Sequence, residues 1–277
     1  MTAAAAAPWS AHLALHWSLR EARSTLIGNR HSGPLRVQKA LYPEGGTGHA
    51  VVLHPPGGIV DGDILDLDIR LDAGAHALHT TPGATKWYKA TGPGARQMLH
   101  ARVGEGAMLE WLPQENIVFD RAQTHLSNTI ELDAGAGYIG WDVVCLGREA
   151  SGERFEHGAI RLEGRILREG RLLWAERAAF AADDPLIDSP LGLGGARVFA
   201  TVVAAGRMLG ASVLDACRAI PAEAPDRCGV SAVDDVLVAR WIGRSSQSAR
   251  TWCERIWRTV RPGMCGRDAC APRIWST

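Results

Sequence analysis

The chain repeats one pattern three times: LDAGAHALHTTPGATKWY (71–88), VGEGAMLEWLPQENIVF (103–119) and LDAGAGYIGWDVVCLGRE (132–149). Each copy opens with a Gly-Ala pair and runs into a loop of polar, aromatic or proline residues. The pairs lie 32 and 29 residues apart. A small unit rebuilt at a nearly constant interval is typical of stacked β architectures. We therefore predict a mainly β fold in which strands stack in a helical arrangement.

Short apolar alternations bounded by Gly, Pro, Ser or Asn extend this expectation on both sides of the repeats. In DILDLDIRLD (63–72) the alternation predicts a strand with one buried and one solvated face. Further strands are expected in GAIRLEGRILREGRLLWAERAAF (158–180), where Gly164 and Gly170 stand at hairpin-like intervals, and in ARVFATVVAAGRM (196–208). Residues 13–208 are thus expected to be β-rich, after a disordered, alanine-rich extension over residues 1–12.

The C-terminal part adds a small helical annex. ASVLDACRAI (211–220) fits a short helix, and SSQSARTWCERIWRTVR (245–261) fits a longer one with Trp252, Ile256 and Val260 on one face. Ser245 or Ser246 is expected to cap its start and Pro262-Gly263 to end it. DDVLVARWIG (234–243) is a candidate strand returning to the sheet. We treat residues 13–277 as one domain, with mixed α/β structure over 209–277.

Four arginines mostly flank the apolar face of the longer helix: Arg250, Arg255, Arg258 and Arg261. They indicate either a solvated face or a helix that binds in a groove.

Charge and composition argue against several partners. The 30 basic and 30 acidic residues give a formal net charge of zero, so neither nucleic acid nor a membrane surface is expected to bind. A nearly neutral chain has little charge repulsion to oppose association, so we expect it to work in a complex. No stretch approaches 18 consecutive apolar residues, and no basic segment of a secretion signal opens the chain. A cytoplasmic location is the expectation.

The motifs of common catalysts are missing. The sequence has no phosphate-binding G-x-x-x-x-G-K-[ST], no G-x-G-x-x-G after a strand and no G-x-S-x-G. His76 and His79 lie three apart on a predicted strand, which sends their side chains to opposite faces. Cys265 and Cys270 could ligate a metal, but no histidine follows residue 157 to complete a set, and two unlinked thiols are the simpler interpretation. A nucleotide hydrolase, an α/β-hydrolase and a tightly bound dinucleotide cofactor are therefore not expected.

Carboxylates are more informative. Glu115 and Asp142 stand beside tryptophans in apolar stretches, where an unpaired charge costs on the order of several kcal/mol. We expect both to be paired or to line a wet cavity. Paired acids on stacked strands also leave open an enzyme that acts on acidic polysaccharide.

Six blocks in order resemble the UreD (UreH) family of urease accessory proteins. They are LHPPGGIVDGD (53–63), TTPGATKWY (80–88), LEWLPQENIVFD (109–120), WDVVCLGREASGE (141–153), LLWAE (172–176) and an ending that runs from Arg261-Pro262 to PRIWST (272–277). The resemblance implies a non-catalytic maturation factor, or chaperone, mainly of β-strands. It also implies binding to apo-urease, to UreF and to the GTPase UreG, and indirectly to the nickel carrier UreE. Nickel would pass through the protein into the urease metallocentre.

Transfer needs contacts that are individually weak, such as carboxylates, because tight ligation would oppose release. Five acids in the matching blocks are our candidates for this nickel route: Asp63, Glu115, Asp142, Glu153 and Glu176. Lys86 is a candidate ion-pair partner. The competing interpretation of each acid is a structural ion pair.

Overall fold

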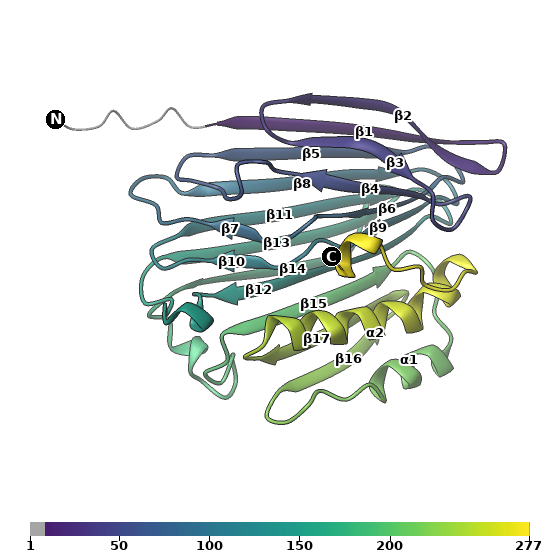
Figure 1. The fold of residues 1–277 in the computed structure, drawn as a ribbon. Coiled ribbons are helices and arrows are strands. Elements are labelled where there is room, and N and C mark those ends of the chain that lie inside the picture. Colours follow the sequence, from purple (N-terminus) through teal and green to yellow (C-terminus); the bar gives the residue numbers. More distant parts are fainter. Residues whose placement is uncertain (1–8, 277) are drawn as a thin grey trace.

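The computed structural model describes residues 9–276, which form two facing β-sheets with helices on the outside of one of them (Figure 1). The first sheet has seven strands, in the spatial order β14 (Arg171–Ala181), β13 (Ala159–Arg168), β11 (Gln123–Leu132), β8 (Ala95–Val103), β5 (Ile64–Leu71), β1 (Ser10–Arg20) and β2 (Arg23–Ser32).

The second sheet has ten strands. Eight follow the order β16 (Arg227–Val233), β17 (Val236–Gly243), β15 (Val198–Ala205), β12 (Gly137–Leu146), β9 (Met108–Trp111), β6 (His76–Thr80), β4 (Gly48–Leu53) and β3 (Arg36–Leu41). Beside this path, β10 (Asn116–Val118) pairs with β12 and with β7 (Thr85–Trp87).

Stacked coils build the middle of both sheets. The chain passes from β5 to β6, from β8 to β9 and from β11 to β12, and each passage crosses from the first sheet to the second. Strands β5, β8 and β11 pair in parallel, as do β6, β9 and β12. The prediction of a mainly β, helically stacked fold with a small C-terminal helical part is confirmed.

The three Gly-Ala pairs are the corners of these coils. Gly74, Gly106 and Gly135 have φ angles of 69°, 65° and 64°, in the left-handed region that favours glycine. The alanines that follow them are fully buried. Gly74 N–H donates to Glu105 O at 2.8 Å, so one corner bonds to the next. The repeat is therefore a stack of corners in which each position demands a small residue.

Two cores hold the layers together. One fills the space between the sheets, and the other lies between the second sheet and helix α2 (Ser246–Cys265). Strand β12 is buried along almost its whole length because it borders both cores.

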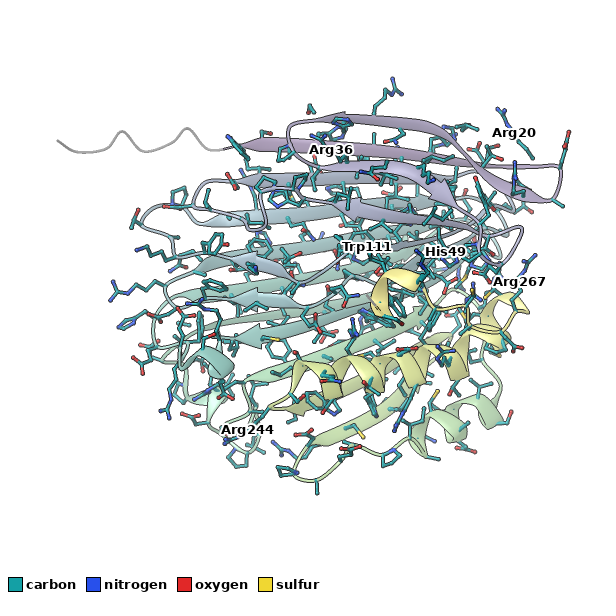
Figure 2. The ribbon with its side chains drawn as sticks, viewed as in Figure 1. Arg20, Arg36, His49, Trp111, Arg244 and Arg267 are labelled. Atoms are coloured by element: carbon teal, nitrogen blue, oxygen red, sulfur yellow. The ribbon has the colours of Figure 1, made fainter. Side chains whose placement is uncertain are left out.

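Charged side chains such as Arg20 and Arg244 project at the rim, whereas Trp111 and His49 are buried and lie inward (Figure 2).

Helix α2 begins as expected and ends later. Ser245 Oγ accepts a hydrogen bond from Ser248 N–H at 3.1 Å, which caps the start. The helix continues past Pro262 to Cys265 and ends at Gly266, whose φ is 64°. The expected end at Pro262-Gly263 is wrong, because burial of side chains on both sides of the proline holds the last turn in place.

The remaining helices are short. Helix α1 (Ala211–Arg218) lies where the sequence predicted it, and three 3-10 turns are η1 (Glu149–Ser151), η2 (Pro185–Ile187) and η3 (Arg273–Ser276). Of the helices in the described part of the chain, none has both the length and the apolar character to cross a membrane.

Two further expectations need correction. Strand β1 begins at Ser10, inside the segment expected to be a disordered extension, and residues 1–8 of that segment lie outside the described residues. Gly164 does not punctuate a hairpin but lies within β13, while Gly170 does stand in the β13–β14 turn. The two glycines differ because only Gly170 has a positive φ, of 76°.

Candidate functional site

A cavity of about 630 Å³ lies between the two sheets. Strands β11, β13 and β14 of the first sheet and β12, β15 and β17 of the second supply most of its lining. That lining is largely apolar and includes Leu126, Ile130, Tyr138, Trp174, Phe180 and Phe199. The few polar groups in such a space decide what it can hold.

Strand register aligns these polar groups into two rows. In the first sheet, Asn128 of β11 pairs with Gly164 of β13, which pairs with Glu176 of β14. In the second sheet, the corresponding row is Asp142 of β12, Thr201 of β15 and Arg240 of β17. We call these six residues the polar crossing.

Two contacts join the rows across the gap. Asn128 Nδ2 donates to Asp142 Oδ2 at 3.1 Å, and Arg240 Nη2 donates to Glu176 Oε1 at 2.8 Å. Between them, Gly164 has no atom within 4 Å of the place that a Cβ would occupy. The polar crossing is thus bridged at both ends and open in the middle.

The carboxyl group of Asp142 has a raised pKa. Burial first, and then the nearby charge of Glu176, raise the pKa of Asp142 to about 6, while the Asn128 hydrogen bond opposes the rise. A cation beside this group would favour its ionised form. Asp142 therefore changes its protonation state close to pH 6.

The structure brings together two of the five acids selected from the sequence. Asp142 and Glu176 both belong to the polar crossing, whereas the other three lie elsewhere. Glu115 Oε1 lies 4.0 Å from Arg250 Nε of α2. The expectation that Glu115 and Asp142 are paired or line a cavity is confirmed.

The remaining predicted residues lie outside the polar crossing. Asp63 and Glu153 stabilise local structure, and Lys86 is exposed. The carboxylate of Asp63 accepts backbone N–H groups of Trp9 at 2.9 Å and Val60 at 3.0 Å, which anchors the start of β1. Glu153 forms a 2.6 Å ion pair with Arg148. Lys86 is exposed and makes no ion pair among residues 9–276, so the structure pairs it with none of the five acids.

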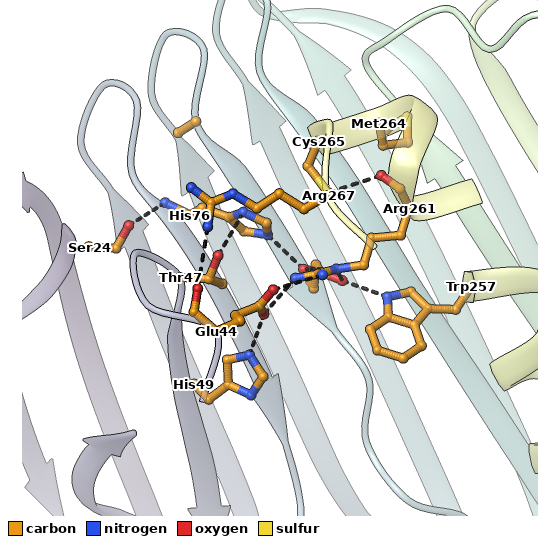
Figure 3. A network of polar contacts seen from close by, with 12 residues as sticks. Ser24, Glu44, Thr47, His49, His76, Trp257, Arg261, Met264, Cys265 and Arg267 are labelled. Atoms are coloured by element: carbon orange, nitrogen blue, oxygen red, sulfur yellow. Dashed lines mark hydrogen bonds and ion pairs between the residues drawn. The ribbon is translucent and has the colours of Figure 1, made fainter. Parts of the chain in front are cut away.

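A second polar cluster, which sequence reasoning missed, fastens α2 to the second sheet (Figure 3). Its centre is Arg261, whose side chain is 0% exposed. Arg261 Nε lies 3.0 Å from Glu110 Oε1, and Arg261 Nη2 lies 2.7 Å from Glu44 Oε1. We call this cluster, with the groups bonded to it, the Arg261 clamp.

The carboxylates of the Arg261 clamp are fully satisfied. Trp257 Nε1 donates to Glu110 Oε2 at 2.5 Å, and His76 Nε2 lies 2.6 Å from Glu110 Oε1. Burial alone would raise the pKa of Glu44, but hydrogen bonds from His49 and Arg261 lower it to about 2. The sequence left a solvated face or a groove-binding helix open for Arg261, and the structure shows a buried ion-pair centre instead.

Two histidines that are neighbours in the sequence belong to different layers. His76 reaches the Arg261 clamp, while His79 Nε2 accepts a hydrogen bond from Trp17 Nε1 at 3.0 Å in the core between the sheets. The prediction that their side chains point to opposite faces is confirmed.

Cys265 lies beside the clamp and not in a ready metal site. Ligand atoms of His76, Glu110 and Cys265 lie within 4.8 Å of one another. The fold thus places a histidine beside Cys265, although no histidine follows residue 157 in the sequence. However, Arg261 already neutralises Glu110, and burial, as the main cause, raises the pKa of Cys265 to about 12. A protonated thiol beside a guanidinium is a poor cation ligand.

Comparison with known proteins assigns the chain to a class. The model of the family described as "UreD urease accessory protein" matches residues 10–276. "Urease accessory protein UreD" of Methylobacillus flagellatus is 47% identical over 270 residues, covering 97% of this chain and 95% of the relative. The protein of the same name from Dechloromonas aromatica is 48% identical over 274 residues, with the same coverage. The chain belongs to the UreD family of urease accessory proteins.

Proposed function

We propose that this protein is a non-catalytic scaffold for assembly of the urease nickel centre. It binds apo-urease together with UreF and UreG, receives nickel that UreE delivers, and works in the cytoplasm. Membership in the UreD family supports the link to urease maturation. Since its relatives are named as accessory proteins, we do not propose the polysaccharide-cleaving enzyme that paired acids left open.

We further propose that nickel crosses the protein through the polar crossing. The observation that carries this step is a pair of acids, Asp142 and Glu176, inside a largely apolar cavity with open space at Gly164. Nickel here is cargo, so the site must release it as readily as it accepts it.

The chemistry of the polar crossing suits such passage. Carboxylate, amide and hydroxyl oxygens are harder donors than imidazole or thiolate, so they hold a nickel ion weakly. Arg240 neutralises Glu176 and Asp142 is half-protonated near pH 6, which further limits retention. An arriving divalent ion displaces the Asp142 proton and competes with the Arg240 guanidinium for Glu176. When the ion leaves, both contacts can re-form.

Nickel loading of urease tests this route. Urease is co-expressed with its accessory proteins and with Asp142→Asn, Glu176→Gln or the double variant, and its nickel content is measured after purification. We expect a substantial loss in the double variant. Glu153→Gln, which changes an acid on the surface, is the matched control and should load nickel normally.

Partner binding is measured in the same cells by pull-down of apo-urease and UreF. Retained binding with reduced nickel would support the route. Normal loading by the double variant would rule out the polar crossing while leaving the scaffold role intact. Failure of the unaltered protein to bind either partner would overturn the scaffold role itself.

A further inference from the structure

The outer face of the first sheet carries a cluster of metal-ligand groups, far from the cavity in the sheet sandwich. His12 of β1 pairs in register with Asp66 of β5, and the next outward position of β5 is Asp68. The intervening Leu67 is buried in the core, so both acids share the outer face with His12. One ligand atom from each of the three lies within 4.8 Å of the other two.

The cluster contains more negative charge than its one ion pair neutralises. His12 Nε2 lies 2.8 Å from Asp68 Oδ2, and this is the one ion-pair contact of Asp68 among residues 9–276. Asp66 forms no ion pair within the same residues, and its Oδ1 is buried without a hydrogen-bond partner. A buried carboxylate oxygen without a donor is costly, and a bound cation would satisfy it.

We propose that His12, Asp66 and Asp68 bind a divalent transition-metal ion, with Ni²⁺ and Zn²⁺ as the best-matched occupants. One imidazole and two carboxylates form a mixed nitrogen and oxygen set, which favours these ions over Mg²⁺ or Ca²⁺. Ligand atoms on one ion at about 2.1 Å are at most about 4 Å apart, so only small side-chain rotations are needed. The side chains of His12 and Asp68 are 41% and 53% exposed, so water can complete the coordination.

Binding replaces a proton on His12 with the ion. The Nε2–H that donates to Asp68 loses its proton to solvent, the ion takes the lone pair left on Nε2, and the neutral ring carries its remaining proton on Nδ1. Asp68 then contacts the ion through the oxygen that it offered to His12.

A neighbouring group in the same two strands provides a matched comparison. His16 Nε2 lies 2.8 Å from Asp72 Oδ1, the same distance as in the His12 pair, but Arg70 Nε lies 3.3 Å from that same oxygen. The His16 pair thus has an arginine where the His12 pair has a second carboxylate. The proposal predicts binding at the first group and none at the second.

Equilibrium dialysis of the purified full-length protein against Ni²⁺ or Zn²⁺ tests the site. We expect Asp66→Asn/Asp68→Asn and His12→Ala each to lose one bound equivalent or to bind at least about tenfold more weakly. His16→Ala should bind as the unaltered protein does, and circular dichroism checks the fold of each variant. Asp142→Asn/Glu176→Gln should also retain this equivalent, which separates the outer site from the proposed nickel route.

A second measurement does not depend on the variants folding. Nickel-edge anomalous diffraction, or shifts of the His12 ring resonances on adding Zn²⁺ to the unaltered protein, should place the ion at His12. Equal binding by the Asp66/Asp68 double variant, an equal loss in His16→Ala, or an ion placed elsewhere would overturn the proposal.

Discussion

The polar crossing and the Arg261 clamp each contain two carboxylates, but they differ in burial and in pairing. In the clamp, Glu44 and Glu110 share a fully buried guanidinium and receive further bonds from histidine and tryptophan. In the crossing, Asp142 has only an amide partner, and open space adjoins Gly164. Complete pairing fixes a helix in place, whereas in the crossing a carboxyl group with fewer partners faces a cavity.

Breaking the clamp should have the largest effect. Arg261→Met leaves Glu44 and Glu110 buried without their main cation, so we expect a loss of about 3–5 kcal/mol in the free energy of unfolding. Urea denaturation measures it. Arg258→Met is the control, since its ion pair with Glu254 is partly exposed and worth less than about 1 kcal/mol. Similar losses in both variants would contradict a buried clamp.

Neutralising the crossing should have a smaller effect of opposite sign. Unfolded, Asp142 ionises near pH 3.8, whereas in the folded protein its pKa is about 6. Ionisation therefore disfavours folding fully above about pH 6 and not at all below about pH 4. Asp142→Asn removes this cost, so we expect a gain of about 1–3 kcal/mol at neutral pH that disappears in acid.

Thermal unfolding at a series of pH values measures this gain. Asp133→Asn alters an exposed acid and should show no such pH dependence. A gain in Asp142→Asn that persists unchanged at pH 4 would show that the carboxyl group is not held in its protonated form.

Filling the open part of the crossing should change stability least. Gly164→Val adds a side chain where nothing lies within 4 Å, and valine suits a strand, so we expect a change within about 1 kcal/mol. Gly48→Ala is the contrast, because its Cβ would lie 2.1 Å from the buried Trp17 ring and should destabilise strongly.

The two glycine variants also test the route. If nickel passes the crossing, Gly164→Val should reduce the nickel content of co-expressed urease while leaving the protein folded. Normal nickel loading by a stably folded Gly164→Val would argue against passage at this point.

Local patterns were sufficient to predict the coils. The recurring Gly-Ala pairs indicated a repeated unit, and the structure gives the reason for them: at a corner of the coil, Gly74 has a positive φ and Ala75 is fully buried. The spacing of Trp252, Ile256 and Val260 predicted the buried face of α2. The end of α2 was missed, since the local rule for proline ignores the buried contacts that hold the next turn.

Contacts between residues far apart in the sequence could not be predicted from local patterns. Arg258 and Arg261 look alike in the sequence, yet Arg258 pairs with Glu254 one turn away, whereas Arg261 meets acids that lie 151 and 217 residues earlier. Among the five selected acids, composition and family blocks could not separate Asp142 and Glu176 from Asp63 and Glu153. Sheet register and two contacts make that separation. Register aligns Asn128, Gly164 and Glu176 in one sheet and Asp142, Thr201 and Arg240 in the other, and the Asn128–Asp142 and Arg240–Glu176 hydrogen bonds join the two rows.

The sequence by itself determined the mainly β coil, its repeated Gly-Ala units, the amphipathic C-terminal helix and the resemblance to UreD. Each of these depends on backbone conformation or periodicity over a few neighbouring residues, or on blocks that can be recognised in order. Only the tertiary structure decided which buried charges are satisfied and which face open space. Burial and electrostatic pairing depend on groups that are far apart in the chain, and folding alone brings them within contact distance.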